Sequence, residues 1–476
     1  GGPEGCPMPG RCRSAIKQPA SVISKDAPVD LLGMVELLHR HVTESLCDKV
    51  FRENRTVERQ REWSLHALAW FWMAVMIRAP KALTRELDQA RRGQDRLLTA
   101  VDATPEAFFQ KSKGLHWRFF AELFNSLGAR LMPETRLAYA RQVEGLREHF
   151  PEIWVMDGSQ LAAVARRLKI LWKVRAAVLP GRIFVLYDLF RGVCRVLHFD
   201  PDAAKNENLL AKEALALIPE GTLVLGDRLF GHSGYFQELS QRKLWGVFRR
   251  HGLAKVRRLK ILGQVRKGRE FLDDTLVRVG CGANGKAQQI LRLIRYRSRG
   301  RRLDIFTNVL DPKKLPAHKA VELYWLRWGI ERMFYDLKVV LNLNCFYAAN
   351  PNAIAMQIYA AAIVYNAFRI IQARIAEQHG IAPEMLSTAR LYPKLAVASA
   401  SLADCELMWR ETLRVNSGMK LNKPDYSKFG FASTTVGVIL VEKKTRPRTK
   451  GRGRPPSTWL SWRKVRGGQK LMAQLS

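Results

Sequence analysis

Three aspartates each stand where an apolar, strand-like run ends. Asp157 follows Ile-Trp-Val-Met and precedes Gly-Ser, Asp227 follows Thr-Leu-Val-Leu-Gly, and Asp188 follows Ile-Phe-Val-Leu-Tyr. Ligands and active sites gather at such strand ends in α/β sheets. An aspartate there is also a common turn or cap residue. The setting alone therefore does not decide which of the three takes part in chemistry.

A second group of polar residues repeats with helical spacing further along the chain. Tyr324, Arg327, Glu331 and Lys338 fall within an arc of roughly 60° at about 100° per residue. A solvated stripe of salt bridges would give the same pattern on a surface helix. Trp328 lies beside the same face, and a stripe that mixes aromatic and charged residues suits a cleft better than open solvent.

The elements that must position these residues form a mixed pattern. Residues 29–149 show helical periodicity throughout, typical of a packing module or a DNA-binding domain. Short apolar runs then alternate with helical segments, which predicts a mixed α/β sheet. The apolar run Ala67–Ile77 is too short to span a bilayer and is predicted to be a buried helix. No membrane-spanning segment is expected.

Charge separates two segments from the rest of the chain. The 476 residues carry a net charge of +36, which favours a polyanionic partner and argues against an ordinary small-molecule enzyme. Residues 242–302 hold 19 Lys/Arg and 3 acidic residues, and residues 443–476 hold 11 Lys/Arg and no acidic residue. Because no membrane element is expected, these two cationic segments are predicted to meet DNA phosphates.

The spacing Tyr-x2-Arg-x3-Glu-x6-Lys at residues 324–338 resembles the Tyr-Arg-Glu-Lys signature of bacterial insertion-sequence transposases with a DDE active site. Every spacer agrees. Asp157-Gly158-Ser159 resembles the context of that family's first catalytic aspartate. Asp227, between a predicted strand and helix, resembles the second. The resemblance covers roughly residues 150–370.

The resemblance implies an α/β, RNase H-like catalytic core interrupted by a β-rich insertion. Asp157, Asp227 and Glu331 would be the catalytic residues and would bind two Mg²⁺ ions, with Mn²⁺ as a substitute. Such a pair activates the attacking oxygen and stabilises the leaving one. The implied reaction is cleavage at transposon ends and strand transfer into target DNA.

The same resemblance implies a set of DNA contacts and an assembly. The partners would be double-stranded DNA, as terminal inverted repeats and target, and a second copy of the chain in a synaptic dimer on the nucleoid of the bacterial cytoplasm. In the tail, Arg452-Gly453-Arg454-Pro455 matches the core of an AT-hook, although nonspecific phosphate binding explains it equally simply. The residues expected to bind DNA are Tyr324, Arg327, Lys338, Trp328, Arg295, Arg297, Arg299, Arg301, Arg302, Arg452 and Arg454.

Together, these patterns divide the chain into six parts. They are a flexible lead (1–28), the helical N-terminal domain (29–149), the catalytic core (150–250 and 311–380), the basic β-rich insertion (251–310), a C-terminal region (381–442) and a disordered basic tail (443–476). The seven cysteines lack metal-ligand spacing, as expected of reduced thiols in a cytosolic protein.

Two alternatives remain at this point: a catalytically inactive DNA-binding relative, and an RNase H-like nuclease that does not join strands. One departure also stands out. Some members of the family hold a flipped base with a tryptophan on the last strand of the insertion, and Leu303 stands at about that position.

Overall fold

The computed structural model describes residues 24–54, 63–92, 97, 101–160, 182–200, 207–280, 288–298, 300–343, 345–347, 350–399 and 434–441. Most of the predicted flexible lead, much of the C-terminal region and all of the basic tail lie outside the described residues.

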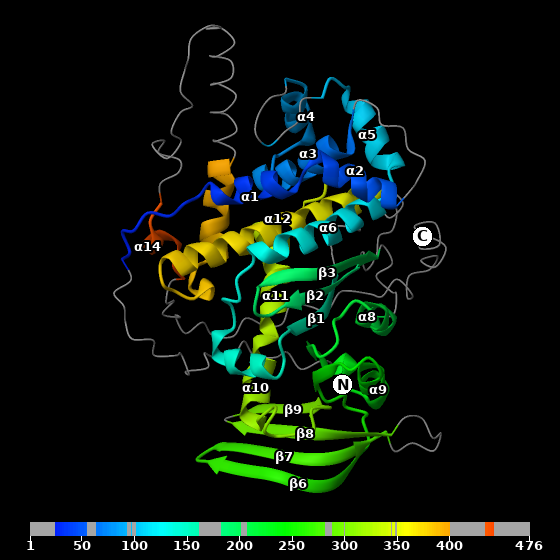
Figure 1. The fold of residues 1–476 in the computed structure, drawn as a ribbon, viewed down its shortest axis with the longest axis vertical. Helices are drawn as coiled ribbons and strands as arrows, with labels where there is room; N and C mark the ends of the chain where they lie inside the picture. The colour runs from blue at the N-terminus through cyan, green and yellow to red at the C-terminus, as the bar shows by residue number, and fades with distance from the viewer. Residues whose placement is uncertain are drawn as a thin grey trace, which may run out of the picture.

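A nine-stranded sheet runs through the molecule in the order β3-β2-β1-β4-β5-β9-β8-β7-β6. β1, β4 and β5 are parallel neighbours, and the other neighbouring pairs are antiparallel. The strands are β1 (Ile153–Gln160), β2 (Arg182–Asp188), β3 (Val193–Asp200), β4 (Leu223–Gly226), β5 (Trp245–Arg249), β6 (Val256–Lys267), β7 (Glu270–Val279), β8 (Gln289–Ser298) and β9 (Arg301–Thr307). Figure 1 shows β6–β9 at the end of the sheet furthest from the N-terminal helices.

The four strands of the expected insertion are hydrogen-bonded into this sheet through β9, which pairs with β5. β7, β8 and β9 overlap three strand-like apolar runs of the sequence, at residues 275–279, 290–296 and 303–309. β6 was not predicted, because it is an edge strand exposed along nearly its whole length and therefore lacks the alternation of buried and exposed residues that marks a strand. Two irregularities in its register, between Arg258 and Lys260 and between Ile261 and Gly263, are bulges of the kind that protect sheet edges from further pairing.

Each face of the sheet is covered by its own hydrophobic core. On one face Val155, Leu225 and Val247 belong to the large core shared with the N-terminal helices and α12. On the other face Met156 and Phe248 belong to a second core. That second core also includes residues of α8 (Glu207–Leu215) and α9 (Ser233–Gln241). Side chains of a strand alternate between the two faces, so the parity of a position fixes its face.

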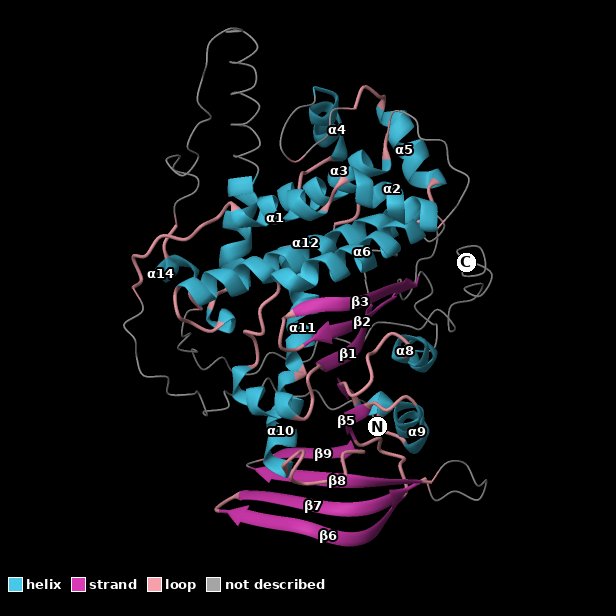
Figure 2. Ribbon diagram, in the orientation of Figure 1, coloured by secondary structure: helices cyan, strands magenta, loops and turns pink. Residues whose placement is uncertain are grey.

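Helices form a layer over the β3 side of the sheet (Figure 2). Thr43, Ser64 and Thr104 cap the starts of α2, α3 and α5 by accepting a backbone N–H, as expected of N-cap residues. α3 is buried over nearly its whole length, as predicted. The helices of this layer before the sheet are α1 (Gly33–His41), α2 (Glu44–Glu53), α3 (Leu65–Arg78), α4 (Leu83–Arg92), α5 (Pro105–Gly114) and α6 (Arg118–Leu131), followed by the 3₁₀ segments η1 (Met132–Glu134) and η2 (Arg141–Glu148).

α12 (Pro351–Gln378) is the central helix of this layer and contacts α3, α6 and β3. Among the described helices it alone is long and apolar enough to cross a membrane, and its apolar window is wholly buried within the protein. A buried core helix passes the same test of length and composition. The remaining elements include α10 (Ala317–Leu326), α11 (Trp328–Tyr335), the π-helical segment η5 (Asp336–Val340), η4 (Arg228–Phe230), η6 (Pro383–Met385) and α14 (Val436–Ile439). The predicted mixed α/β class is confirmed, and the sheet is large.

Candidate active site

The register of two parallel strands brings Asp157 beside Asp227. Val155 on β1 lies opposite Leu225 on β4. Each aspartate follows its partner residue by two positions, so the two carboxylates extend from neighbouring chains at the same level. Asp157 shares the face of Val155, because side chains alternate along a strand. Asp227 follows the end of β4 and acts electrostatically on Tyr324 and Arg327, so both aspartates lie on the side of the sheet that α10 and α11 cover.

Arg327, at the junction of α10 and α11, joins the third acid to the first. Its Nη2 donates to Oε1 of Glu331 at 2.8 Å, and its Nη1 donates to Oδ2 of Asp157 at 3.3 Å. The Arg327 side chain is only 11% exposed. Burial by itself lowers the pKa of Arg327, but Tyr324 and the negative charges of Asp157, Glu331 and Asp227 outweigh it and raise the pKa above its usual range. All three predicted catalytic acids thus act on one guanidinium.

Tyr324 lies close enough to Asp227 for the carboxylate to affect its pKa. Burial raises the pKa of Tyr324 to about 12, and the negative charge of Asp227 adds to this, while Arg327 and Arg249 oppose it. The guanidinium carbon of Arg327 is 5.8 Å from the centre of the Tyr324 ring and 6.0 Å from that of Trp328. The phenol is therefore a neutral hydrogen-bonding group packed against a cation.

The last residue of the signature reaches the site through a π-helical turn. η5 replaces the final α-helical turn, so the regular wheel of about 100° per residue does not extend to Lys338. Its Nζ nevertheless donates to Oγ of Ser159 at 2.6 Å. π-Turns inside helices are frequent at functional sites. The helix end is thereby tied to the strand that carries Asp157.

Asp188, which the sequence did not separate from the other two aspartates, has a different role. It lies opposite Trp154, three residues before Asp157 on β1. Its carboxylate is fully buried, accepts the N–H groups of Phe190 and Arg191, and pairs with Arg191 and Arg195 at 3.0 and 3.3 Å. Burial raises the pKa of Asp188, Glu152 raises it further, and Arg191 opposes both. Asp188 therefore stabilises the turn between β2 and β3.

The chemistry of the donor set fits Mg²⁺, which prefers carboxylate oxygens. Within the described ranges, however, no group of three or more acidic, histidine or cysteine side chains lies close enough together to hold one ion. The guanidinium of Arg327 lies between Asp157 and Glu331. The three acids share one face, but a cation of the protein itself stands between two of them.

The insertion arginines are less available than their number suggested. Arg292, which the charge count placed among the phosphate-neutralising cations, is fully buried. It pairs with Asp274 and donates to the carbonyl oxygens of Val309, Asp311 and Leu315. That expectation was wrong for Arg292, which instead anchors the segment leading into α10.

Three of the predicted DNA-binding arginines on the insertion lie on the face opposite the acids. Arg295 and Arg297 pair with Asp273 and Asp304 at 3.3 and 2.6 Å. Arg302 lies across from Arg297 and therefore shares its face.

Arg301 lies across from Ser298, on the face that carries the acids. The pairing of residues from strand to strand between β1 and β9 determines which insertion residues lie on the same face of the sheet as the acids. Leu303, on the acid face, is buried and lies across from Tyr296. Arg299, Arg452 and Arg454 lie outside the described residues.

Two residues at the site were missed by the sequence reading. Arg249 ends β5 on the acid face and opposes the effect of Asp227 on Tyr324. The signal was present, since Arg249 follows an apolar run as Asp227 does. Ser159 was noted only as part of the context of Asp157, and its bond with Lys338 depends on a contact between residues 179 positions apart.

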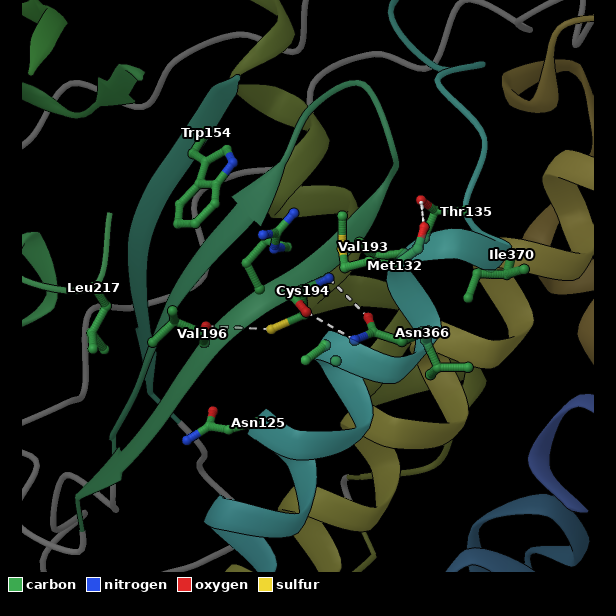
Figure 3. A pocket seen from close by; sticks show the side chains of 14 residues that line it. Asn125, Met132, Thr135, Trp154, Val193, Cys194, Val196, Leu217, Asn366 and Ile370 are labelled. Atoms are coloured by element: carbon green, nitrogen blue, oxygen red, sulfur yellow. Dashed lines mark hydrogen bonds between the residues drawn. The ribbon is translucent and has the colours of Figure 1, made fainter. Parts of the chain in front are cut away.

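A pocket of about 340 Å³ lies at the β3 edge of the sheet, away from these residues. Figure 3 shows Asn366 of α12 bonded to the backbone of Cys194, with Trp154 on the far wall. The acids and the signature residues are absent from the described lining. This pocket is therefore separate from the candidate active site.

Comparison with known families agrees with the geometry. Residues 173–367 match the family described as "Transposase DDE domain". This part of the chain is similar to the DDE domain of transposases. The matched range includes Asp227 and the signature from Tyr324 to Lys338, whereas Asp157 precedes it. The resemblance seen in the sequence is thereby confirmed.

Among curated proteins, the chain is similar to "Putative transposase y4zB" of Sinorhizobium fredii (strain NBRC 101917 / NGR234), with 29% identity over 193 residues. The match covers 40% of this chain and 52% of that protein, so the chain spans about half the length of the curated relative. Among solved structures it is similar to a piggyBac transposase synaptic complex with hairpin DNA. The identity is 10% and the TM-score 0.38, over 84% of this chain and 88% of the other.

Proposed function

We propose that this protein is a DNA transposase that cuts at the ends of its element and joins them to target DNA by in-line phosphoryl transfer. One observation carries the proposal: Asp157, Asp227 and Glu331, distant in sequence, converge on one face of the sheet around Arg327. β1–β5 with α10–α12 would form an RNase H-like core, and β6–β9 would be the insertion.

The three acids would hold two divalent metal ions, Mg²⁺ with Mn²⁺ as a substitute, and such a pair supplies activation of the attacking oxygen and stabilisation of the leaving one. The side chains around them would hold the DNA. Arg327 can bind a phosphate through two N–H groups, and Lys338 can bind one as a point charge. Tyr324, kept neutral by its raised pKa, can donate a hydrogen bond.

The substrates and the assembly belong to the same proposal. The signature residues and the exposed cations of the insertion suit duplex DNA, whose phosphates they would neutralise. Two copies of the chain would act together in a synaptic dimer on the bacterial nucleoid, each holding one end of the element.

The test is to replace each acid by its uncharged isostere: Asp157→Asn, Asp227→Asn and Glu331→Gln. We expect each to abolish cleavage of a labelled duplex carrying the element's own end, with Mg²⁺ present, and to leave gel-shift binding intact. Glu322→Gln, on α10 and paired with Lys319 rather than Arg327, is the control and should cut normally. Full cleavage by any of the three would exclude that residue from the catalytic set.

The products distinguish the transposase from its rivals. Joined molecules in which the element end is linked to target DNA require strand transfer. Cleavage without any joined product would favour an RNase H-like nuclease. DNA binding without cleavage by the unchanged chain would favour an inactive relative.

A further inference from the structure

Arg327 occupies the position between two acids that a metal ion would need. Nη1 lies 3.3 Å from Oδ2 of Asp157, and Nη2 lies 2.8 Å from Oε1 of Glu331. A bound Mg²⁺ would need its oxygen ligands at about 2.1 Å. An ion that bridged these two oxygen atoms would have to occupy the space that the guanidinium fills, so the two compete for this position.

The guanidinium also offsets the negative charge of two carboxylates that are partly withdrawn from water. The Asp157 and Glu331 side chains are 19% and 36% exposed, and carboxylates withdrawn from water are costly unless paired. Arginine stays protonated at any working pH. Arg327 is thus a permanent cation whose contacts with both acids stabilise the site without a metal.

Not every N–H group of the Arg327 side chain takes part in a hydrogen bond. Nε of Arg327 is buried and has no hydrogen-bond partner in the part of the chain that the structure describes. Leaving a buried donor unpaired costs free energy. Only the two Nη atoms hold the side chain on the acids, and the guanidinium carbon lies 5.8 and 6.0 Å from the centres of the Tyr324 and Trp328 rings.

We propose that Arg327 is the resident counter-cation of the catalytic acids, and that divalent metal ions compete with it for Asp157 and Glu331. Metal binding then releases the guanidinium from the carboxylates and makes its two donors available to a DNA phosphate. This inference rests on the proposed function, because it takes the acids to be metal ligands. It adds that metal loading and phosphate binding are coupled through one side chain.

The alternative interpretation is that the Arg327 contact is permanent and fixes the helix to β1. In that case Arg327 positions the acids for the metal, and removing its side chain would weaken metal binding. If Arg327 instead competes with the metal for the acids, removing its side chain would strengthen metal binding. The two readings predict opposite signs for the same measurement.

The experiment is a titration of the full chain with Mn²⁺ in the absence of DNA, followed by electron paramagnetic resonance of the free ion. We expect Arg327→Gln to bind Mn²⁺ about fivefold more tightly or better, the lower range of typical coupling between competing ligands. Lys319→Gln removes one positive charge from α10 without touching the acids and should leave the affinity unchanged. Equal or weaker binding by Arg327→Gln would overturn the proposal.

Further variants separate the possible failures. Glu331→Gln should lose Mn²⁺ binding; if the unchanged chain and Arg327→Gln both lack binding that depends on Glu331, the metal site of the proposed function fails as well. Should Arg327→Gln not fold, Arg327→Lys serves instead, because a single ammonium cannot contact both acids as a fork does. It should bind Mn²⁺ more tightly than the unchanged chain, and binding no tighter than that would count against competition.

Discussion

Lys338 is the residue that ties the end of the signature helix to β1. Its ammonium is bonded to Ser159 and is partly withdrawn from water. Burial lowers the pKa of Lys338, because a low-dielectric environment disfavours the charged form. The folded protein therefore binds this proton less tightly than the unfolded chain, in which the pKa returns to about 10.4.

This shift makes stability depend on pH with a definite sign. Where the unfolded state binds more protons, stability rises with pH, so the contribution of Lys338 increases between its lowered folded pKa and about 10.4. We expect Lys338→Met to lack this increase, so that its stability relative to the unchanged chain falls as pH rises through that window. Urea unfolding at several pH values measures it, with Lys319→Met on α10 as control. If the difference in stability between Lys338→Met and the unchanged chain were constant with pH, burial would not lower the pKa of Lys338.

At the scale of elements, the site depends on a loop that is held in place by contacts with a neighbouring strand. The segment after β4, which begins with Asp227 and contains η4, packs against the end of β5. The N–H of His251 donates to the carbonyl oxygen of Gly231 at 3.0 Å. A Cβ added at Gly231 would lie 1.9 Å from the carbonyl oxygen of Arg249. Glycine is required here by close approach of two backbones.

We expect Gly231→Ala to push this loop away from β5 and destabilise the protein by roughly 1–3 kcal/mol, as overpacking does. It should also displace Asp227 and reduce cleavage. Gly252→Ala, where nothing lies within 4 Å of an added Cβ, is the matched control and should change neither property. Urea unfolding and the cleavage assay measure the two effects. Normal stability of Gly231→Ala would mean that the loop is free to move.

At the scale of the whole molecule, one sheet divides the cations of the insertion between two faces. Arg301 and Arg302 are neighbours on β9 and both are exposed, but alternation sends them to opposite sides. Arg301 shares the face of the acids, and Arg302 shares that of Arg297. A duplex lying over the acids can meet only the first of them.

We therefore expect Arg301→Ala to weaken binding of the element's end, and to reduce the salt dependence of binding by about one phosphate contact. Arg302→Ala, one residue away and equally charged, should have a smaller effect. Gel shifts of the same duplex over a range of salt concentrations measure both. Equal losses would show that DNA contacts both faces of the insertion.

The sequence by itself determined the order and type of most elements. Apolar runs at residues 183–187, 193–199, 245–248 and 290–296 predict strands where β2, β3, β5 and β8 lie, and helical periodicity at 353–378 predicts α12. Each of these elements buries a face or its whole surface. Residue spacing also indicated the resemblance to DDE transposases, since Tyr324, Arg327, Glu331 and Lys338 lie close together in the chain, on the consecutive segments α10, α11 and η5. β6 could not be predicted from the sequence, because an edge strand that is exposed on both sides lacks the alternation of apolar and polar residues.

Only the tertiary structure decided which residues meet. Asp157, Asp188 and Asp227 look alike in sequence, and the pairing of β1 with β2 and β4 separates them: it sets Asp157 beside Asp227 and Asp188 beside the start of β1. Likewise Arg292 counts as one positive charge in the sequence, but burial against Asp274 removes it from the surface. The sequence determines the spacing of neighbouring residues directly. The contacts that decide the role of a charged residue form between segments that are far apart in the sequence, so only the tertiary structure shows them.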